Sequence, residues 1–148
     1  MFLACISYFG VGTLVPVDRY VDPQKYIDVL DDNLWPLVCK YFGGKRWFFQ
    51  DDNAPVHRSL ITRQWKTENS IPSITWPAQS PDINVIENTW KVIKCHVQQN
   101  ISNIETRQDL IACVLKRRRQ LTSAYIRQLC DSIPRRIRSV IISRAEVI

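Results

Sequence analysis

Two groups of acidic residues stand where a metal-dependent reaction could take place. Asp51 and Asp52 follow the aromatic run of "WFFQDDNAPVH" (47–57), and Glu87 lies in "SPDINVIENTWKVIK". We expect the pair at the end of a buried strand and Glu87 at the start of a helix, where α/β folds gather functional groups. Carboxylates brought together repel each other unless a cation lies between them. Such hard oxygen ligands select Mg²⁺ or Mn²⁺, and these ions support phosphoryl transfer.

The same residues also suit purely local roles. Asp52 and Asn53, just before Pro55, make a good turn and helix cap. Asn84 and Glu87 match a capping box, in which the first residue caps the helix and the acid three residues later bonds back to it. Residue types alone leave capping and metal binding both open, and capping is the commoner of the two.

Strand and helix patterns alternate along the first half of the chain, and the second half is helical in pattern. We expect a hairpin over residues 2–17 with its turn at Gly10-Val11-Gly12. A helix should open at Asp22-Pro23 and stop at Gly43-Gly44. Further expectations are short strands at 45–50 and 73–76, a helix from Pro55 to about Asn69, a loop at 77–82, and helices from Asn84 onward with breaks near Asn100 and at Pro134. This order predicts one α/β domain over residues 1–148 with a helical C-terminal part.

The net charge of +6 is concentrated at the C-terminal end. After residue 111, nine Lys and Arg stand against only Asp131 and Glu146. This asymmetry fits a polyanionic partner such as nucleic acid, or a solvated helix face. The candidates for contacts with a DNA backbone are Lys116, Arg117, Arg118, Arg119, Arg135, Arg136 and Arg138, together with Lys91 and Lys94, which follow Glu87 by four and seven residues. Lys91 could instead form an ion pair with Glu87.

Composition speaks against two other classes of protein. No stretch reaches the roughly 18 continuous apolar residues that a membrane helix requires, so no membrane partner is expected. The five cysteines are odd in number and widely spaced without a C-x-x-C motif, and the two histidines are isolated. A zinc site is therefore not expected, and reduced thiols are the simplest interpretation.

Taken together, the two acidic segments resemble the catalytic core of Tc/mariner-superfamily DNA transposases. The family places its second catalytic Asp in a Gln-Asp-Asn-x-Pro-x-His motif, and residues 52–57 keep Asp-Asn-Ala-Pro-Val-His. Its third acid lies in Ser-Pro-Asp-Leu-Asn-Pro-Ile-Glu-Asn-x-Trp, which residues 80–90 match with Val85 in place of the usual Pro. The hairpin and the closing "SIPRR" are similar to the family's flanks, so the resemblance covers nearly the whole chain.

The resemblance selects one of the two adjacent acids. The Tc-type branch places thirty-four residues between its second and third acids, as between Asp52 and Glu87, whereas Asp51 stands where the family commonly has Gln. The resemblance implies that Asp52 and Glu87 are catalytic residues that bind Mg²⁺ or Mn²⁺, with Asn53, His57 and Asn88 beside them. His57 could equally be a packed surface histidine. The implied fold is RNase H-like, with a mixed sheet flanked by helices, and the implied partner is DNA in the nucleus.

The family uses three acids, and its first lies on a strand upstream of the hairpin. We expect the chain to lack that strand, its Asp and the preceding helix-turn-helix region, because Met1 falls at or within the second strand. The edges of the hairpin and of residues 45–50 would then pair directly or stay unsatisfied. With two of three ligands, the isolated chain is expected to be inactive, so its status as an enzyme depends on the missing Asp.

Three functional hypotheses follow. The first is a fragment of a cut-and-paste transposase, whose intact form cleaves and joins DNA with a metal. The second is a catalytically dead remnant that binds DNA through its basic helices. The third is an interaction protein that docks onto an intact transposase and blocks its assembly. The partners considered for the chain are therefore DNA, a second copy in a homo-oligomer, and an intact transposase.

Overall fold

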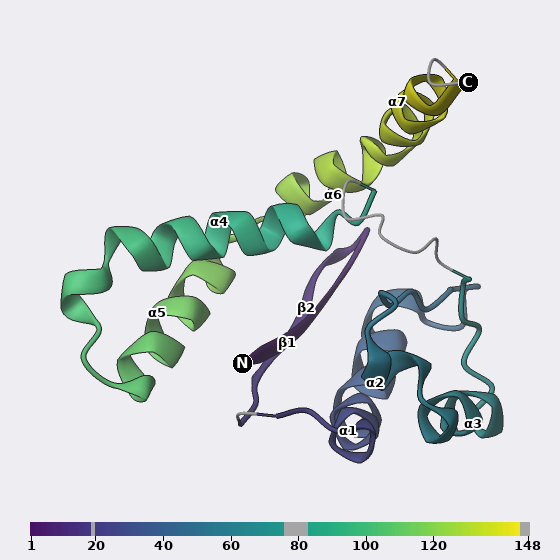
Figure 1. The fold of residues 1–148 in the computed structure, drawn as a ribbon, viewed down its shortest axis with the longest axis horizontal. Helices are drawn as coiled ribbons and strands as arrows, with labels where there is room; N and C mark the ends of the chain where they lie inside the picture. Colours follow the sequence, from purple (N-terminus) through teal and green to yellow (C-terminus); the bar gives the residue numbers. More distant parts are fainter. Residues whose placement is uncertain (19, 76–82, 146–148) are drawn as a thin grey trace. The chain divides into compact units, whose positions relative to one another are not determined.

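The structure is a computed structural model that describes residues 1–18, 20–75 and 83–145, except the side chains of the last three (Figure 1). The chain divides into two compact units. Unit 1 comprises Met1–Leu3 and Val15–Gln79, and unit 2 comprises Ala4–Leu14 and Ser80–Ile148. Each unit has buried residues of its own, with Tyr26, Ile27 and Ile71 in the first and Ile93, Val114 and Ile126 in the second.

The chain opens with the predicted hairpin, formed by β1 (Phe2–Ser7) and β2 (Gly10–Pro16). The hairpin is confirmed, but its turn was predicted too late in the sequence. Tyr8 and Phe9 form the turn, where the Phe9 amide donates to Ser7 Oγ at 3.3 Å. Gly10 already belongs to β2 and takes φ 146°, a conformation that side-chain-bearing residues rarely adopt. The glycine therefore serves the strand entry directly after the turn.

The helix predicted after the hairpin is confirmed as α1 (Pro23–Phe42). Asp22 caps it by accepting a 2.8 Å hydrogen bond from the Lys25 amide, which satisfies one of the helix's unpaired donors. Gly43 ends it in the left-handed conformation, at φ 50°. The helix turns Tyr26 toward the interior of unit 1, where its side chain reaches the acidic segment.

The strand predicted at residues 45–50 is wrong as a regular element. Only Phe49 pairs, in a parallel bridge to Ser73, with hydrogen bonds from the Phe49 amide to Pro72 (2.8 Å) and from the Ile74 amide to Phe49 (2.9 Å). One bridge makes no ladder, and Phe48 is 52% exposed rather than buried. The strand at 73–76 likewise reduces to Ser73, with Trp76 outside the described residues. In the described ranges, the predicted mixed sheet is thus the β1–β2 hairpin plus this bridge.

The single helix predicted from Pro55 is divided into α2 (Pro55–Arg58) and α3 (Leu60–Glu68). Ser59 causes the break, because its hydroxyl caps α3 by accepting from the Thr62 amide at 3.2 Å. Thr62 Oγ1 donates to the Val56 carbonyl at 2.8 Å and so satisfies an acceptor that a continuous helix would have used. Thr62 is fully buried while Leu60 is 72% exposed, so α3 faces the core with polar residues.

The C-terminal part of unit 2 is helical, as predicted. It contains α4 (Ile86–Gln99), a short 3₁₀ helix (Ile101–Asn103), α5 (Arg107–Gln120), α6 (Ser123–Asp131) and α7 (Ile133–Ala145). α4 and α5 lie side by side (Figure 1).

The helix breaks of unit 2 agree in part with the sequence. The break near Asn100 is confirmed. The break predicted at Pro134 lies two residues earlier, at Ser132, between α6 and α7. Pro134 itself lies in the first turn of α7, where a missing N–H leaves no helix hydrogen bond unmade. A further break at Leu121–Thr122 was not predicted. The loop predicted at 77–82 lies outside the described residues, and no helix in the described ranges has the length and apolar character to cross a membrane.

Candidate active site

The two adjacent acids of unit 1 have different environments, and Asp51 is the one held inside. Its carboxylate forms an ion pair with the Lys66 ammonium group from α3, and the Tyr26 hydroxyl donates to Asp51 Oδ2 at 3.4 Å. The side chains of Asp51 and Lys66 are only 19% and 9% exposed. The Lys66 Nζ atom also lies 5.1 Å from the centre of the Phe49 ring. Asp51 is thus committed to an internal contact.

Asp52 lies at the surface, with 55% of its side chain exposed. Its Oδ1 atom accepts the Ala54 amide at 2.9 Å, closing a small turn, and lies 2.7 Å from His57 Nδ1. The predicted turn is therefore present, but the predicted cap is wrong, because the residue at the cap of α2 is Ala54 and no side chain bonds there. Both contacts engage Oδ1, so Oδ2 is the oxygen that a cation could approach.

His57 connects this turn to α1. The His57 ring lies 4.3 Å from the Tyr26 ring, centre to centre, and only 14% of the histidine side chain is exposed. The start of α2 at Pro55 directs His57 back toward Asp52, as the sequence suggested it could. Asn53, between the two, is half-buried.

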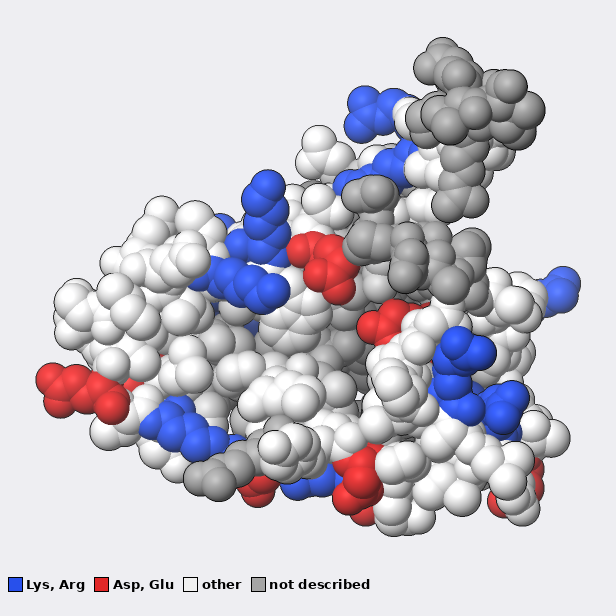
Figure 2. Space-filling view, in the orientation of Figure 1, with Lys and Arg blue, Asp and Glu red and all other residues white. Residues whose placement is uncertain are grey.

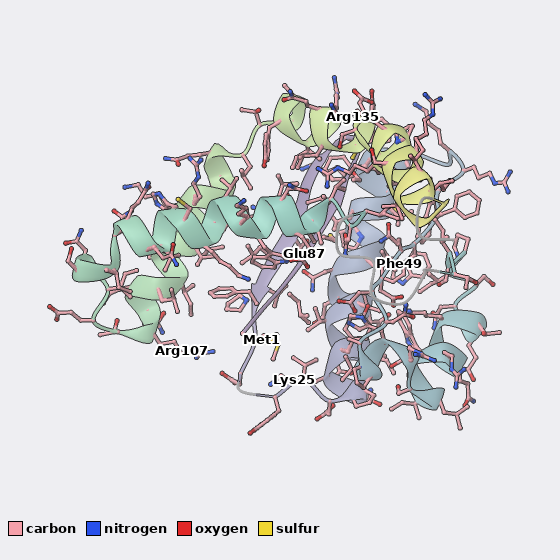
Figure 3. The ribbon with its side chains drawn as sticks, turned by 45° about the horizontal axis from the view of Figure 1, so that its top comes forward. Met1, Lys25, Phe49, Glu87, Arg107 and Arg135 are labelled. Atoms are coloured by element: carbon pink, nitrogen blue, oxygen red, sulfur yellow. The ribbon has the colours of Figure 1, made fainter. Side chains whose placement is uncertain are left out.

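Glu87 belongs to unit 2 and lies in the first turn of α4, where Figure 3 labels it. The predicted capping box is wrong. The helix begins at Ile86 with Val85 at the cap position, and Asn84 Oδ1 only accepts the Ile86 amide at 3.4 Å. The glutamate side chain is exposed and makes no hydrogen bond to any residue that the structure describes. A negative charge there is favoured by the helix dipole.

The donor chemistry at both places suits a hard divalent cation. Asp52 and Glu87 each present an exposed carboxylate, which is the ligand type that Mg²⁺ and Mn²⁺ prefer. No group of three or more potential ligands occurs within the part of the chain that the structure describes. The two carboxylates lie in different units, so each offers its ligand atoms within its own unit.

The cations of α4 are open to solvent. Lys91 and Lys94 are exposed, and Figure 2 shows basic side chains on the face of α4 turned toward the viewer, beside an acidic group at the helix start. Lys91 forms no ion pair with Glu87, so the local alternative for this lysine is wrong. Asn88 is half-buried beside them.

The C-terminal basic residues fall into two groups. Three of them make hydrogen bonds within unit 2: Arg118 donates to the Gly12 carbonyl of the hairpin, Arg117 to Gln120 Oε1 at 3.0 Å, and Arg136 to Ser132 Oγ at 2.8 Å. The DNA-contact roles of all the basic residues named above stay predictions. The exposed members are Lys116, Arg119, Arg135 and Arg138. Figure 3 labels Arg135 near the start of α7.

Two of the five cysteines, Cys5 and Cys130, have thiols with raised pKa values. All five are free thiols. Burial raises the pKa of the Cys5 thiol, outweighing a hydrogen bond from the Thr13 backbone and the charge of Arg118. Burial also raises the pKa of Cys130, with a smaller effect from Asp131. Thiols with raised pKa values are poor nucleophiles.

Lys66 and Tyr26 were not predicted as part of this site. The available signal was general: a carboxylate at the end of an apolar run requires a cation nearby. Several cations follow Asp51 within twenty residues, among them Arg58, Arg63 and Lys66. Only the packing of α3 selects Lys66.

Comparisons with known proteins identify the family of the chain. Residues 24–111 match the model of the DDE superfamily endonuclease family. The Tcb2 transposase of Caenorhabditis briggsae is 30% identical over 142 residues, and the Tc1 transposase of Caenorhabditis elegans is 28% identical over the same length. Both alignments cover 95% of this chain and 50% of the relative, so the chain spans about half the length of these relatives.

Solved structures show the fold. The catalytic domain of the Mos1 mariner transposase superposes with a TM-score of 0.73 at 15% identity, over 96% of this chain and 73% of that domain. The same domain solved with raltegravir and Mn gives a TM-score of 0.72 at 16% identity, over 96% of this chain and 74% of that one. The predicted RNase H-like fold class is confirmed.

Proposed function

We propose a function for this chain from one premise: the chain belongs to the DDE superfamily endonuclease family. We propose that it is the part of a cut-and-paste transposase that carries two catalytic carboxylates, and that the intact protein cleaves and joins DNA strands with a divalent metal. The relatives named as transposases are about twice as long as the aligned region. The reaction is therefore assigned to the longer protein, and residues 1–148 alone are proposed to be inactive.

The observation that carries this proposal is that two adjacent acids have different environments. Asp51 is paired internally with Lys66, whereas Asp52 is 55% exposed and keeps one oxygen directed away from its turn contacts. Glu87 is likewise exposed at the start of α4. These environments support the assignment of Asp52 and Glu87 as ligands, with Asp51 in a structural role.

The metal would be Mg²⁺ or Mn²⁺, in line with the Mos1 structures that were solved with each of these ions. When bound, it would lower the pKa of the attacking water or hydroxyl and neutralise charge on the leaving oxygen. The protein's own part is to hold the ligands. His57 fixes the direction of the Asp52 carboxylate from 2.7 Å, and Asn53 and Asn88 flank the two ligands in sequence.

The first test is Mn²⁺ binding to the 148-residue chain, measured by electron paramagnetic resonance of free Mn²⁺. Asp52→Asn should raise the dissociation constant at least about tenfold, because it removes a charged ligand. Asp32→Asn, a change at an exposed aspartate of α1, is the matched control and should have no effect. Equal affinity of Asp52→Asn and the unchanged chain would refute the assignment.

DNA binding without cleavage is a second candidate function for the chain in isolation. The exposed positions of Lys91, Lys94, Lys116, Arg119, Arg135 and Arg138 favour it. Each phosphate contact should contribute about 0.9 to the slope of log affinity against log salt. The double change of Lys91→Ala and Lys94→Ala should lower that slope by about 2, while Lys40→Ala in unit 1 should not. Binding that is unaffected by salt would exclude it.

Two further expectations belong to this proposal. DNA as the substrate places the protein in the nucleus, which imaging of a fluorescent fusion would test. Assembly with a second copy or with an intact transposase would appear in size-exclusion chromatography with light scattering, as a mass above 17.3 kDa for the chain alone.

A further inference from the structure

Lys66 contacts the segment that leads to Asp52 at two points. Its ammonium group pairs with Asp51 and lies 5.1 Å from the centre of the Phe49 ring. In an extended chain, residues two apart point to the same side and the next residue points to the other. Burial follows this alternation, since Phe49 and Asp51 are partly buried while Gln50 and Asp52 are exposed. Holding Asp51 inward thus directs Asp52 outward.

A second set of contacts holds the same turn from α1. The Tyr26 hydroxyl donates to Asp51 at 3.4 Å, and the Tyr26 ring packs on the His57 ring at 4.3 Å. His57 Nδ1 in turn lies 2.7 Å from Asp52 Oδ1. Both acids are therefore connected through one network of side chains from three helices, and all of it lies within unit 1.

We propose that Lys66 is a positioning residue for the metal-ligating carboxylate of Asp52, acting through its ion pair with Asp51. The inference rests on the proposed function, in which Asp52 is a ligand. Lys66 itself contacts Asp51 and Phe49, and it has no contact with Asp52. Its role is to fix the backbone one residue before the ligand, so that the carboxylate is directed to solvent before any cation arrives.

An ion pair is a costly way to fill a partly buried position. Desolvation of both charges offsets much of their attraction, and apolar residues of similar size often serve stability as well or better. An ion pair differs from an apolar contact in fixing one geometry. Residues that hold a metal ligand in place change metal affinity about 10- to 100-fold when they are removed. The Lys66–Asp51 pair has the location for such a role.

The test uses the 148-residue chain and two readouts by nuclear magnetic resonance. The first is hydrogen exchange of the Ala54 amide, which donates to Asp52 Oδ1 in the absence of metal. The second is broadening of the His57 ring signals by Mn²⁺, which reports metal bound near Asp52. Lys66→Met should speed Ala54 exchange, and it should raise the Mn²⁺ concentration for half-broadening about tenfold. Lys66→Arg keeps the positive charge and should leave both readouts as in the unchanged chain. The control Lys40→Met, at an exposed position of α1, should also change neither.

The outcomes separate this inference from the proposed function. If Mn²⁺ does not broaden His57 in the unchanged chain, the metal assignment fails, while Ala54 exchange still decides whether Lys66 positions the turn. If Lys66→Met only lowers the melting temperature and leaves both readouts unchanged, the positioning role is overturned. Should Lys66→Met not fold, Asp51→Asn combined with Lys66→Met removes both charges together, and the same two readouts apply.

Discussion

The first turns of α4 and α5 have similar sequences and different structures. In each, a polar residue is followed three positions later by an acid. At α5 the box forms: Thr106 Oγ1 accepts the Asp109 amide at 3.2 Å, and Asp109 Oδ2 accepts the Thr106 amide at 2.9 Å. At α4 the corresponding box of Asn84 and Glu87 does not form, and Glu87 remains exposed.

Asp51 and Asp52 of unit 1 differ from each other in the same way as Asp109 and Glu87 of unit 2. Asp51 is occupied by Lys66, as Asp109 is by Thr106, while Asp52 and Glu87 keep oxygens directed to solvent. The ion pair with Lys66 makes Asp51 unavailable as a ligand, whereas the turn contacts of Asp52 engage only Oδ1 and Glu87 makes no hydrogen bond to any described residue. The comparison therefore separates acids that maintain the fold from acids that are placed for binding.

The largest expected effect is on the free energy of unfolding, and it distinguishes Asp51 from Asp52. Asp51→Ala leaves the Lys66 charge buried without its partner and should lower the free energy of unfolding by about 3 kcal/mol. Asp52→Ala removes only an exposed pair and a turn contact, at a cost of about 1 kcal/mol or less. Urea unfolding measures both. Equal losses would contradict the distinction between the two acids.

The next largest effect is on metal affinity, and it distinguishes Glu87 in the first turn of α4 from Asp109 in the first turn of α5. Glu87→Gln should raise the dissociation constant for Mn²⁺ about tenfold, or about 1.4 kcal/mol. Asp109→Asn should leave it unchanged, because Asp109 lies in neither of the two acidic segments assigned to the metal and its Oδ2 atom accepts from Thr106. Titration calorimetry with MnCl₂ distinguishes them. A loss of affinity in the Asp109 variant would show that capping does not exclude a ligand role.

A smaller effect concerns capping itself. Thr106→Ala removes a working N-cap and should lower the free energy of unfolding by about 1 kcal/mol. Asn84→Ala should have almost no effect, since Asn84 is not the cap of α4. Thermal unfolding followed by circular dichroism compares them. The structural assignment of α4 is in error if Asn84→Ala is the more damaging change.

The smallest effect is a dependence on pH at α5. Hydrogen bonds from the Thr106 side chain, then its backbone, hold the pKa of Asp109 below its usual value. A lowered pKa in the folded state means that the contribution to stability is present above the unfolded value of about 4. It is lost as the pH falls through the folded pKa. The difference in melting temperature between the unchanged chain and Asp109→Asn should therefore shrink from pH 6 to pH 3, and a difference that grows would contradict this sign.

Much of the fold was predictable because its signals are local. The cap at Asp22, the stop at Gly43 and the apolar spacing between them specify α1 without reference to the rest of the chain. Helix breaks that depend on one hydroxyl were harder. Ser59 and Ser132 both interrupt helices. Pro134, two residues after Ser132, signals a break nearby, whereas no Pro or Gly follows Ser59 closely enough to distinguish it from a serine inside a helix such as Ser139.

The site was predictable in part, for a different reason. The motif around Asp52 and its spacing to Glu87 identified the family, which the match over residues 24–111 confirms. The ligand roles of Asp52 and Glu87 stay predictions. The strand at 45–50 was wrong, because an aromatic run favours a strand only where neighbouring strands pair with it, and here only Phe49 pairs.

The sequence by itself determined the family, the helical C-terminal part and the positions of the two exposed acids along the chain. Spacing and capping depend on neighbouring residues, so they can be predicted without knowledge of the packing. Tertiary structure alone decided which of two adjacent carboxylates faces inward, because that depends on Lys66 and Tyr26 from separate helices. It also decided that α3 buries Thr62 and Lys66 while exposing Leu60. A polar side chain can be buried only where the fold provides its partner. The neighbouring residues in the sequence do not predict that partner.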